Sequence, residues 1–581
     1  MNSLTRRNFL SRSVLAAAAV NTTPFWTPTA RATMPMPDAG SPLDAKLDAY
    51  IARYMPAMNA PGLTLGLTSA EATLRTVGYG FADTDRKTPV TTDHLFQIGS
   101  ITKSFVALVL MQMRDEGKLE LQKPILAYLP WLPITEPFGV ITPHHLLTHT
   151  SGLPDNQSIF SSDPAARLAQ GFTPGEHFHY CNAGFDILGK LAATLDRRSW
   201  RECVTERILK PLGMHDTRPI VTTADRDRFA VGYEPFWDDE VYPRQGRLTA
   251  APWLVMDDTA GCIASTPGDM ATYTRMLLNH GKHAGGRIAS EESFTLFSTP
   301  YIKADDFSPT ASYGYGIAVD TLDGHKILRH TGGMVAFASS IHVDLDGGVA
   351  AFASINAMQG YRPTAVTEYA VQLLRAQQES KPLPDAADIP DPLEAENAAD
   401  YAGSFSTPAG KQLSFAVQGK RLSLVAEGKT IPLQHQGGDQ FISTIPGVYS
   451  KYMFAFGRKH NDAGEGEGTA PLPLVVQVAY GSDLYVNKDW DGPRVYATLP
   501  FADAFAGHYR SDSAWGGDAR VYVLNGRLML DGTPLVPLGD RLFRVSDVPW
   551  MPDTVEFHHV VDGKAQLMKS GGLDFWRVEV D

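Results

Sequence analysis

The stretch FQIGSITKSFVALVLMQMRDEG, residues 96–117, decides the fold of the first domain. Residues 105–111 are apolar on every face, which is typical of a helix buried in a large domain, and Gly117 is a common residue just beyond the end of such a helix. Ser100 then stands at the helix N-terminus. Lys103 follows three residues later, which puts its amine one turn above the serine hydroxyl on the same face.

The S-x-x-K spacing becomes informative only through this position, because a chain of 581 residues contains roughly one or two such matches by chance. A serine hydroxyl is a weak nucleophile until a neighbouring group accepts its proton. A buried lysine amine can accept that proton once burial lowers the amine's pKa. The alternative interpretation is a serine that caps the helix beside a solvated lysine.

Two further motifs favour the catalytic interpretation. Tyr180-Cys181-Asn182 places a phenol and an amide close together, and His330-Thr331-Gly332-Gly333 ends a predicted strand. Acyl transfer needs a proton shuttle to the leaving group, a donor that orients the substrate carbonyl, and a strand edge free of bulky side chains. Separately, a core tyrosine, a turn asparagine and a strand bulge at paired glycines would explain these residues. Their combination in this order indicates a serine hydrolase site.

These motifs resemble the S-x-x-K, Y-x-N and K/H-T-G boxes of the serine β-lactamase and DD-peptidase superfamily, in its class C and D-aminopeptidase-like branch. The resemblance covers roughly residues 41–378. It implies an α+β fold in which an antiparallel sheet flanked by helices lies beside a helical lobe, with the active site in the cleft between them. Further similar stretches are Phe96-Gln97-Ile98-Gly99, Leu146-Leu147-Thr148-His149-Thr150-Ser151-Gly152-Leu153-Pro154, Pro211-Leu212-Gly213-Met214 and Tyr313-Gly314-Tyr315-Gly316.

The resemblance also implies a role for each motif residue. Ser100 would be the nucleophile, Lys103 its base and Tyr180 the proton shuttle. Asn182 would contact the substrate amide. The backbone N–H groups of Ser100 and Gly333 would form the oxyanion hole, with His330, Thr331 and Gly332 as further substrate-binding residues. No metal or cofactor is expected, and His149 is expected to be structural.

His330 departs from the lysine that β-lactamases and many penicillin-binding proteins have at this position. Because histidine is largely neutral above about pH 7, we expect weaker capture of a substrate carboxylate than a lysine would give. H-T-G variants resemble D-stereospecific aminopeptidases and esterases of the family. The sequence therefore favours a hydrolase of amide bonds in small peptides or amino-acid amides, D-aminopeptidase-like in selectivity. A carboxylesterase is the alternative. A β-lactamase, a DD-carboxypeptidase and a non-catalytic penicillin-binding-like protein are less favoured.

The length of 581 residues predicts two or three domains. A proline-rich linker is predicted at residues 379–398, between a hydrolase domain at 41–378 and a weak internal repeat. The repeat aligns Tyr401-Ala402-Gly403-Ser404-Phe405 with Phe505-Ala506-Gly507-His508-Tyr509, and a hairpin follows each copy. Two small antiparallel β-barrels are expected, at residues 399–497 and 500–581. Relatives of the D-aminopeptidase are similar in carrying paired barrels.

Residues 1–32 resemble a twin-arginine signal peptide, with Arg6-Arg7 before a short apolar run and Ala30-Arg31-Ala32 in A-x-A form. The run is too short to span a bilayer, so a periplasmic or secreted enzyme is expected. The net charge of -13 disfavours nucleic acid as a partner. Three cysteines without a C-x-x-C spacing predict buried thiols. Small molecules or short peptides are the expected partners, and a homodimer stays open.

Overall fold

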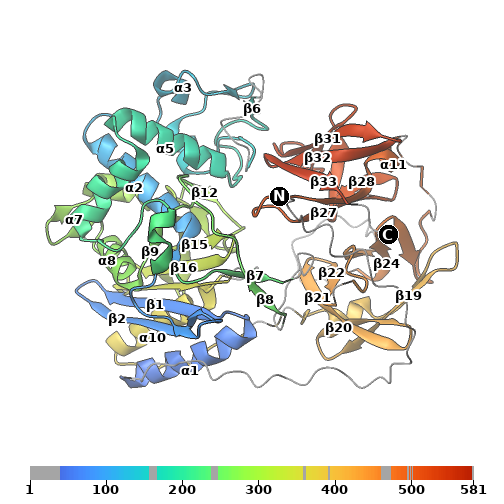
Figure 1. The fold of residues 1–581 in the computed structure, drawn as a ribbon, viewed down its shortest axis with the longest axis horizontal. Coiled ribbons are helices and arrows are strands. Elements are labelled where there is room, and N and C mark those ends of the chain that lie inside the picture. Colours follow the sequence, from blue (N-terminus) through green and yellow to red (C-terminus); the bar gives the residue numbers. More distant parts are fainter. Residues whose placement is uncertain are drawn as a thin grey trace, which may run out of the picture.

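The computed structural model describes residues 40–155, 167–236, 246–357, 362–389, 391, 393–445, 447–459, 473–493, 496–497, 499 and 501–578. The expected signal peptide lies outside these residues. An α+β domain occupies one side of the molecule and two β-barrels the other (Figure 1). The predicted fold class is therefore confirmed.

Strands from both ends of the first domain form one antiparallel sheet. In the described residues its order is β12-β13-β14-β15-β16-β17-β1-β2-β3. The strands are β1 Gly62–Ser69, β2 Thr73–Asp83, β3 Thr88–Pro89, β12 Ile302–Lys303, β13 Ser312–Tyr313, β14 Ala318–Leu322, β15 His325–Met334, β16 Phe337–Asp344 and β17 Val349–Ile355.

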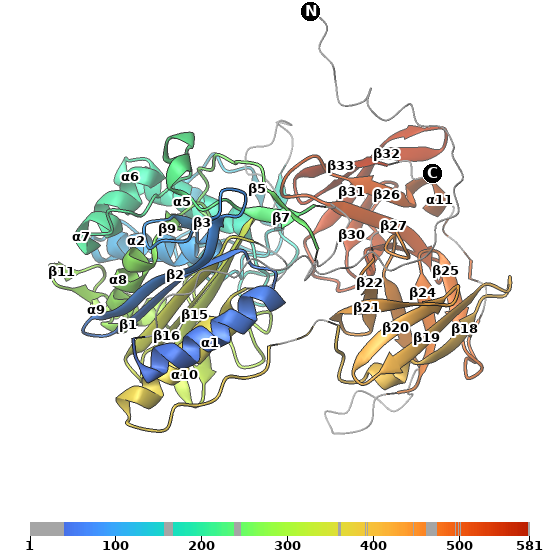
Figure 2. The same cartoon turned by 60° about the horizontal axis from the view of Figure 1, so that its bottom comes forward.

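Helices cover both faces of this sheet, which is why every residue of β1, β16 and β17 is buried. Helices α1 and α10 lie on one face (Figure 2). Between them the ring of Tyr50 meets the ring of Tyr369 edge-on, with 5.2 Å between the centroids. Helix α8 and the helical lobe lie on the other. The helices are α1 Pro42–Ala57, α2 Thr102–Asp115, α3 Ile125–Tyr128, α4 Pro143–Leu147, α5 Asn182–Asp196, α6 Trp200–Val204, α7 Lys210–Leu212, α8 Pro267–Leu278, α9 Glu291–Phe297 and α10 Thr364–Gln378.

The helix predicted after Ser100 is α2, the centre of the helical lobe. Its residues 102–111 are all buried. The α-helix itself begins at Thr102, because Ser100 lies in a preceding 3-10 turn, Gly99–Ile101. Short two-stranded pairs surround the lobe: β4 Phe96–Gln97 with β9 Ala264–Ser265, β5 Ile134–Thr135 with β6 Leu168–Ala169, and β7 Tyr233–Pro235 with β8 Leu248–Ala250.

The C-terminal half forms two closed eight-stranded barrels in the described residues. The internal repeat supplies matching core aromatics, because Tyr401 and Phe405 are buried in the first barrel as Phe505 and Tyr509 are in the second. The first barrel contains β18 Gly403–Ser406, β19 Gln412–Gln418, β20 Arg421–Ala426, β21 Lys429–Gly437, β22 Gln440–Ser443, β23 Phe454–Arg458, β24 Val475–Tyr480 and β25 Asp483–Val486. The second contains β26 Gly507–Arg510, β27 Asp518–Leu524, β28 Arg527–Leu530, β29 Thr533–Pro537, β30 Leu542–Val545, β31 Thr554–Val561, β32 Lys564–Ser570 and β33 Leu573–Arg577.

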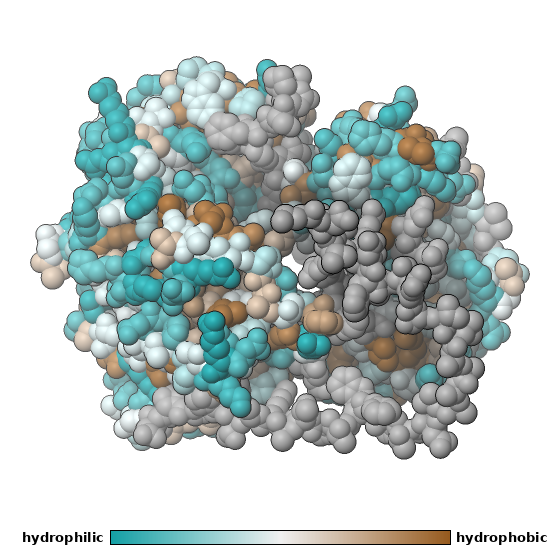
Figure 3. Space-filling model, viewed as in Figure 1, coloured by the Kyte–Doolittle hydropathy of each residue, from teal (hydrophilic) through white to brown (hydrophobic). Residues whose placement is uncertain are grey.

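The three cysteines, Cys181, Cys203 and Cys262, are buried free thiols, as predicted. No helix in the described part of the chain combines the length and apolar character that crossing a bilayer requires. On the face shown in Figure 3, hydrophobic residues of the first domain form small patches among hydrophilic ones.

Candidate active site

The turn that carries Ser100 packs directly on the backbone of strand β15. A Cβ atom on Gly99 would lie 2.6 Å from Gly333 N, and one on Gly332 would lie 1.9 Å from Ile98 O. Gly99 also has φ +53°, a conformation that favours glycine. These glycines therefore allow a backbone approach that side chains would block, and they bring Ser100 beside the H-T-G-G strand.

Lys103 joins three of the chain's motifs through hydrogen bonds. Its Nζ donates to Ser100 Oγ at 3.1 Å, to Asn182 Oδ1 at 2.7 Å and to the Ala260 carbonyl at 2.8 Å. The lysine side chain is fully buried, and its Nζ lies 4.9 Å from the centroid of the Tyr180 ring. The structure thus brings together Ser100, Lys103, Tyr180 and Asn182, although Lys103 and Asn182 lie 79 residues apart in the sequence.

Tyr180 is held by a ring contact with His149, at 4.2 Å between centroids. His149 Nδ1 accepts a hydrogen bond from Cys181 N at 2.9 Å, and burial lowers the pKa of this histidine well below its usual value. A neutral His149 therefore orients the segment that carries Tyr180. This contact agrees with the structural role expected for His149.

Side chains of β15 alternate between two environments. His330 and Gly332 are buried, whereas Thr331 and Gly333 are partly exposed. His330 Nε2 lies 2.9 Å from Tyr313 Oη, and burial lowers the pKa of His330 to about 3. His330 is therefore neutral, as expected, but its ring faces Tyr313 in the interior, and its centroid is 6.5 Å from that of Tyr180.

The neutral His330 supplies no charge to this strand, but Arg362 places a guanidinium beside it. This cation was not part of the expectation of weak carboxylate capture. The Arg362 guanidinium lies against Gly333, where a Cβ atom would come within 2.2 Å of Nη2. Burial lowers the pKa of Arg362, although the nearby Tyr180 and Tyr54 act in the opposite direction. In the described part of the chain no carboxylate pairs with this guanidinium. No motif indicates this contact, because Arg362 reaches β15 only when the chain returns after β17.

Three carboxyl groups surround the acceptors of Lys103. Asp155 Oδ1 accepts hydrogen bonds from Asn182 N at 2.7 Å and from Asn182 Nδ2 at 3.2 Å. Asp186 accepts one from Thr259 N at 3.0 Å and Asp258 one from Gly261 N at 2.7 Å, so the two bracket Ala260. Burial, together with the charge of Asp258, raises the pKa of Asp186 to about 6.

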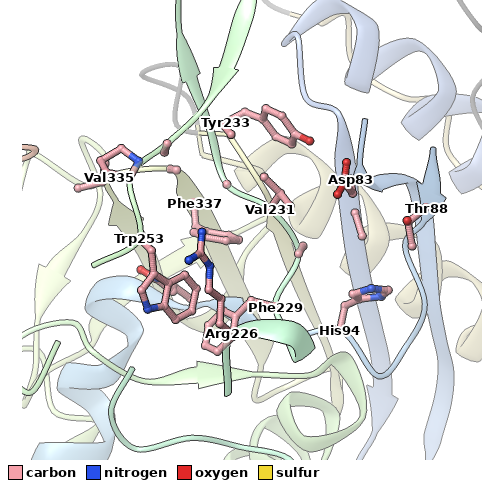
Figure 4. Close-up of a pocket in the computed structure, with 18 of the residues that line it drawn as sticks. Asp83, Thr88, His94, Arg226, Phe229, Val231, Tyr233, Trp253, Val335 and Phe337 are labelled. Carbon is pink, nitrogen blue, oxygen red and sulfur yellow. The ribbon is translucent and has the colours of Figure 1, made fainter. Parts of the chain in front are cut away.

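A groove of about 750 Å³ begins beyond the end of β15 (Figure 4). Val335 lines it two residues after Gly333, and Gln97 lines it three residues before Ser100. Arg226 lies with its guanidinium carbon 5.6 Å from the centroid of the Trp253 ring. The groove offers apolar surface and charge beside the nucleophile turn, and sequence analysis did not identify it.

The arrangement suits acyl transfer. A serine hydroxyl stands beside a buried amine, the Tyr180 ring lies 4.9 Å from that amine, and the turn that carries Ser100 packs on the Gly333 backbone. The described residues contain no group of three or more His, Cys, Asp or Glu side chains suited to holding a metal ion. Sequence reasoning missed Ala260, Asp155 and Arg362. Asp155 directly follows the quoted segment that ends at Pro154, but nothing in its spacing marks it as a partner of Asn182.

Comparisons with known proteins agree with this geometry. The Beta-lactamase family model matches residues 47–376. Penicillin-binding protein 4 of Amycolatopsis lactamdurans is 29% identical over 287 residues, which span 45% of this chain and 72% of that protein. Penicillin-binding protein 4* of Bacillus subtilis (strain 168) is 25% identical over 284 residues, which span 45% of this chain and 60% of that protein.

Among solved structures, the octameric penicillin-binding protein homologue from Pyrococcus abyssi is similar, with a TM-score of 0.54 and 24% identity. The match covers 76% of this chain and 98% of that chain, and it supports the fold alone. The family match covers more than half of the chain and contains all three motifs. The chain therefore belongs to the β-lactamase family, whose members are serine hydrolases related to the penicillin-binding proteins.

Proposed function

We propose that this protein cleaves amide bonds of small peptides or amino-acid amides through an acyl-enzyme on Ser100, with D-aminopeptidase-like selectivity. The observation that carries the proposal is the fully buried Lys103 amine 3.1 Å from Ser100 Oγ. In its neutral form the amine accepts from Ser100 Oγ instead of donating to it, and it can then take the serine proton as the hydroxyl attacks the substrate carbonyl.

In this mechanism the acyl carbonyl oxygen lies between the N–H groups of Ser100 and Gly333, which stabilise the negative charge that develops on it. Tyr180 passes a proton to the leaving amine, and Asn182 contacts the substrate amide. The strand that contains His330, Thr331 and Gly332 aligns the substrate along β15 through its backbone and the partly exposed Thr331, while the His330 ring points into the interior. Water then attacks the acyl-enzyme, and Ser100 regains its proton.

The test is a panel of matched D- and L-aminoacyl p-nitroanilides with a p-nitrophenyl ester of the same acyl group. Faster turnover of the D-anilides supports the proposal. Turnover confined to the ester would favour a carboxylesterase, and turnover without chiral preference would exclude the D-selectivity.

One observation favours a second candidate, a substrate with a free carboxylate such as a peptide C-terminus or a β-lactam. The Arg362 guanidinium packs on Gly333 and has no carboxylate partner among the described residues. A partly buried cation without a carboxylate partner costs desolvation energy, and a substrate carboxylate would offset part of that cost. Adding peptides with free and amidated C-termini to the panel separates the two candidates.

We also propose that residues 1–32 direct export by the twin-arginine route, so that the enzyme acts in the periplasm or outside the cell. The support is the Arg6-Arg7 pair, the apolar run and the A-x-A site after it.

A further inference from the structure

A loop of the second barrel, residues 546–553 between β30 and β31, reaches the first domain and has a fixed shape. Arg544 donates to the carbonyls of Ser546 and Pro549, each at 3.2 Å. Val545 N donates to Asp553 O at 2.9 Å and closes the loop. We call residues 546–553 the barrel loop.

The barrel loop packs on the segment that leads to Tyr180. Trp550 stacks on His177 at 4.3 Å between ring centroids with an interplanar angle of 12°. A Cβ atom on Gly171 would lie 2.4 Å from Trp550 O, so a glycine is needed for this approach. Asp553 Oδ2 lies 3.4 Å from Nε2 of His179, the residue before Tyr180. The barrel therefore contacts the catalytic segment itself.

A chain of hydrogen bonds continues from this loop to Lys103. Asp553 Oδ1 accepts from Asp155 N at 2.9 Å, across 398 residues of sequence. Asp155 Oδ1 in turn accepts from both nitrogen atoms of Asn182, at 2.7 Å and 3.2 Å. Asn182 Oδ1 accepts from Lys103 Nζ at 2.7 Å.

The order of donors in this chain fixes the orientation of the Asn182 amide. An ionised carboxylate can only accept, so Asp155 attracts the Asn182 NH₂ group and leaves Oδ1 facing Lys103. A flipped amide would direct its NH₂ group at the lysine, where two donors would meet. Asp155 can act in this way only while its backbone is held in place, and the Asp553 carboxylate contributes to this by accepting a hydrogen bond from Asp155 N.

We propose that Asp553 is a positioning residue of the catalytic site, which acts through Asp155 to hold the Asn182 amide against Lys103. This inference rests on the proposed function, since it assumes that Lys103 and Ser100 carry out acylation. The second barrel would then support catalysis itself. Its effect would not depend on the size of the substrate, because it acts on the groups around Lys103.

The experiment measures the rate of Ser100 acylation by a small active-serine phosphonate, together with kcat and KM for a small amide, in the full-length protein. Asp553→Ala should slow labelling and lower kcat by about tenfold or more, because small displacements of catalytic groups are costly, with KM changed little. Asp553→Asn keeps an oxygen that can accept from Asp155 N and should recover most of the rate. Asp547→Ala is the control, since Asp547 lies in the same loop but pairs with Arg527 at 3.6 Å.

A double-mutant cycle keeps the test decisive if Asp553→Ala also weakens folding. Once Asn182→Ala has removed the end of the chain, Asp553→Ala should have little further effect on the labelling rate of the folded fraction. Wild-type labelling by Asp553→Ala, or an equal loss in both backgrounds, would overturn the inference. Failure of the wild type to label at Ser100 would instead overturn the proposed function.

Discussion

The guanidinium of Arg362 occupies the space next to Gly333 that a side chain at position 333 would need. Gly333 therefore takes part in two close contacts. One is with Arg362, and the other is with Gly99, on which a Cβ atom would lie 2.6 Å from Gly333 N. The nucleophile turn packs on one side of the strand and a cation lies on the other. Any substrate aligned along β15 would lie within the electrostatic reach of that cation.

Ser100→Ala should abolish turnover and labelling by an active-serine phosphonate, because the buried Lys103 amine has no other serine hydroxyl as a hydrogen-bond partner in the described residues. Mass spectrometry of the labelled protein and an amide assay provide the measurement. Persistent labelling in the variant would show that another residue is the nucleophile.

Tyr180→Phe should reduce hydrolysis of an anilide by roughly 10²–10⁴-fold and affect a p-nitrophenyl ester of the same acyl group much less. An amine leaving group needs a proton, whereas p-nitrophenolate does not. The ratio of kcat/KM for the two substrates is the readout. A similar fractional loss for both would mean that Tyr180 does not protonate the leaving group.

Asp186 should make the protein less stable as pH rises. Its pKa is raised to about 6 in the folded state, mainly by burial, above the unfolded value near 4. The folded state binds more protons between these values, so stability present below about pH 4 is lost as pH rises through about 6, by at most about 3 kcal/mol. Asp186→Asn should therefore raise the free energy of unfolding at pH 7.5 and change it little at pH 4.

Urea unfolding at the two pH values measures this difference, with Asp547→Asn as a surface control. An equal effect of Asp186→Asn at both pH values would contradict a proton-linked origin.

Arg6→Lys combined with Arg7→Lys should leave the enzyme in the cytoplasm, because the arginine pair is what the export receptor recognises. Cell fractionation followed by an activity assay measures the distribution. Unchanged periplasmic activity would exclude the twin-arginine route.

Local signals explain which parts of the fold could be predicted. Helix α8 begins at start signals that are visible in the sequence, because Thr266 caps it directly before Pro267. The strand at 349–355 has an equally clear local signal, because its residues are apolar except for Ser354, as suits a short strand buried on both faces. The start of α2 was missed by two residues, since Ser100 belongs to a tight turn that brings Gly99 onto Gly333.

The missing parts of the candidate site depend on tertiary contacts alone. Asp553 and Asp155 meet across 398 residues, and no pattern near either residue indicates the other. Arg362 lies just before α10, and nothing in the sequence around it indicates a contact with β15. The motifs identified Ser100 and Asn182, which accept hydrogen bonds from Lys103, because each lies in a recognisable stretch of sequence. They did not identify Asp155, the carboxylate that orients Asn182.

The role of the Arg362 guanidinium beside β15 can be tested by removing it. Adding a positive charge at position 330 is not a suitable test. His330 is buried, bonded to Tyr313 and surrounded by aromatic rings, so a lysine there would bury a second charge near Lys103. A loss of activity in such a variant would report damaged folding. Arg362→Met instead removes the charge and keeps much of the side-chain volume.

Arg362→Met should lower kcat/KM for a peptide with a free C-terminal carboxylate by about tenfold or more, since a hydrogen bond to a charged group contributes about 1.5–3 kcal/mol. The same peptide with an amidated C-terminus should change by less than about threefold, because it presents no charge to the guanidinium. Arg362→Lys should recover part of the difference, and Arg226→Met, in the groove beyond β15, is the matched control. Equal losses for the two peptides would show that Arg362 supports β15 structurally, and the amino-acid amide would then remain the better substrate class.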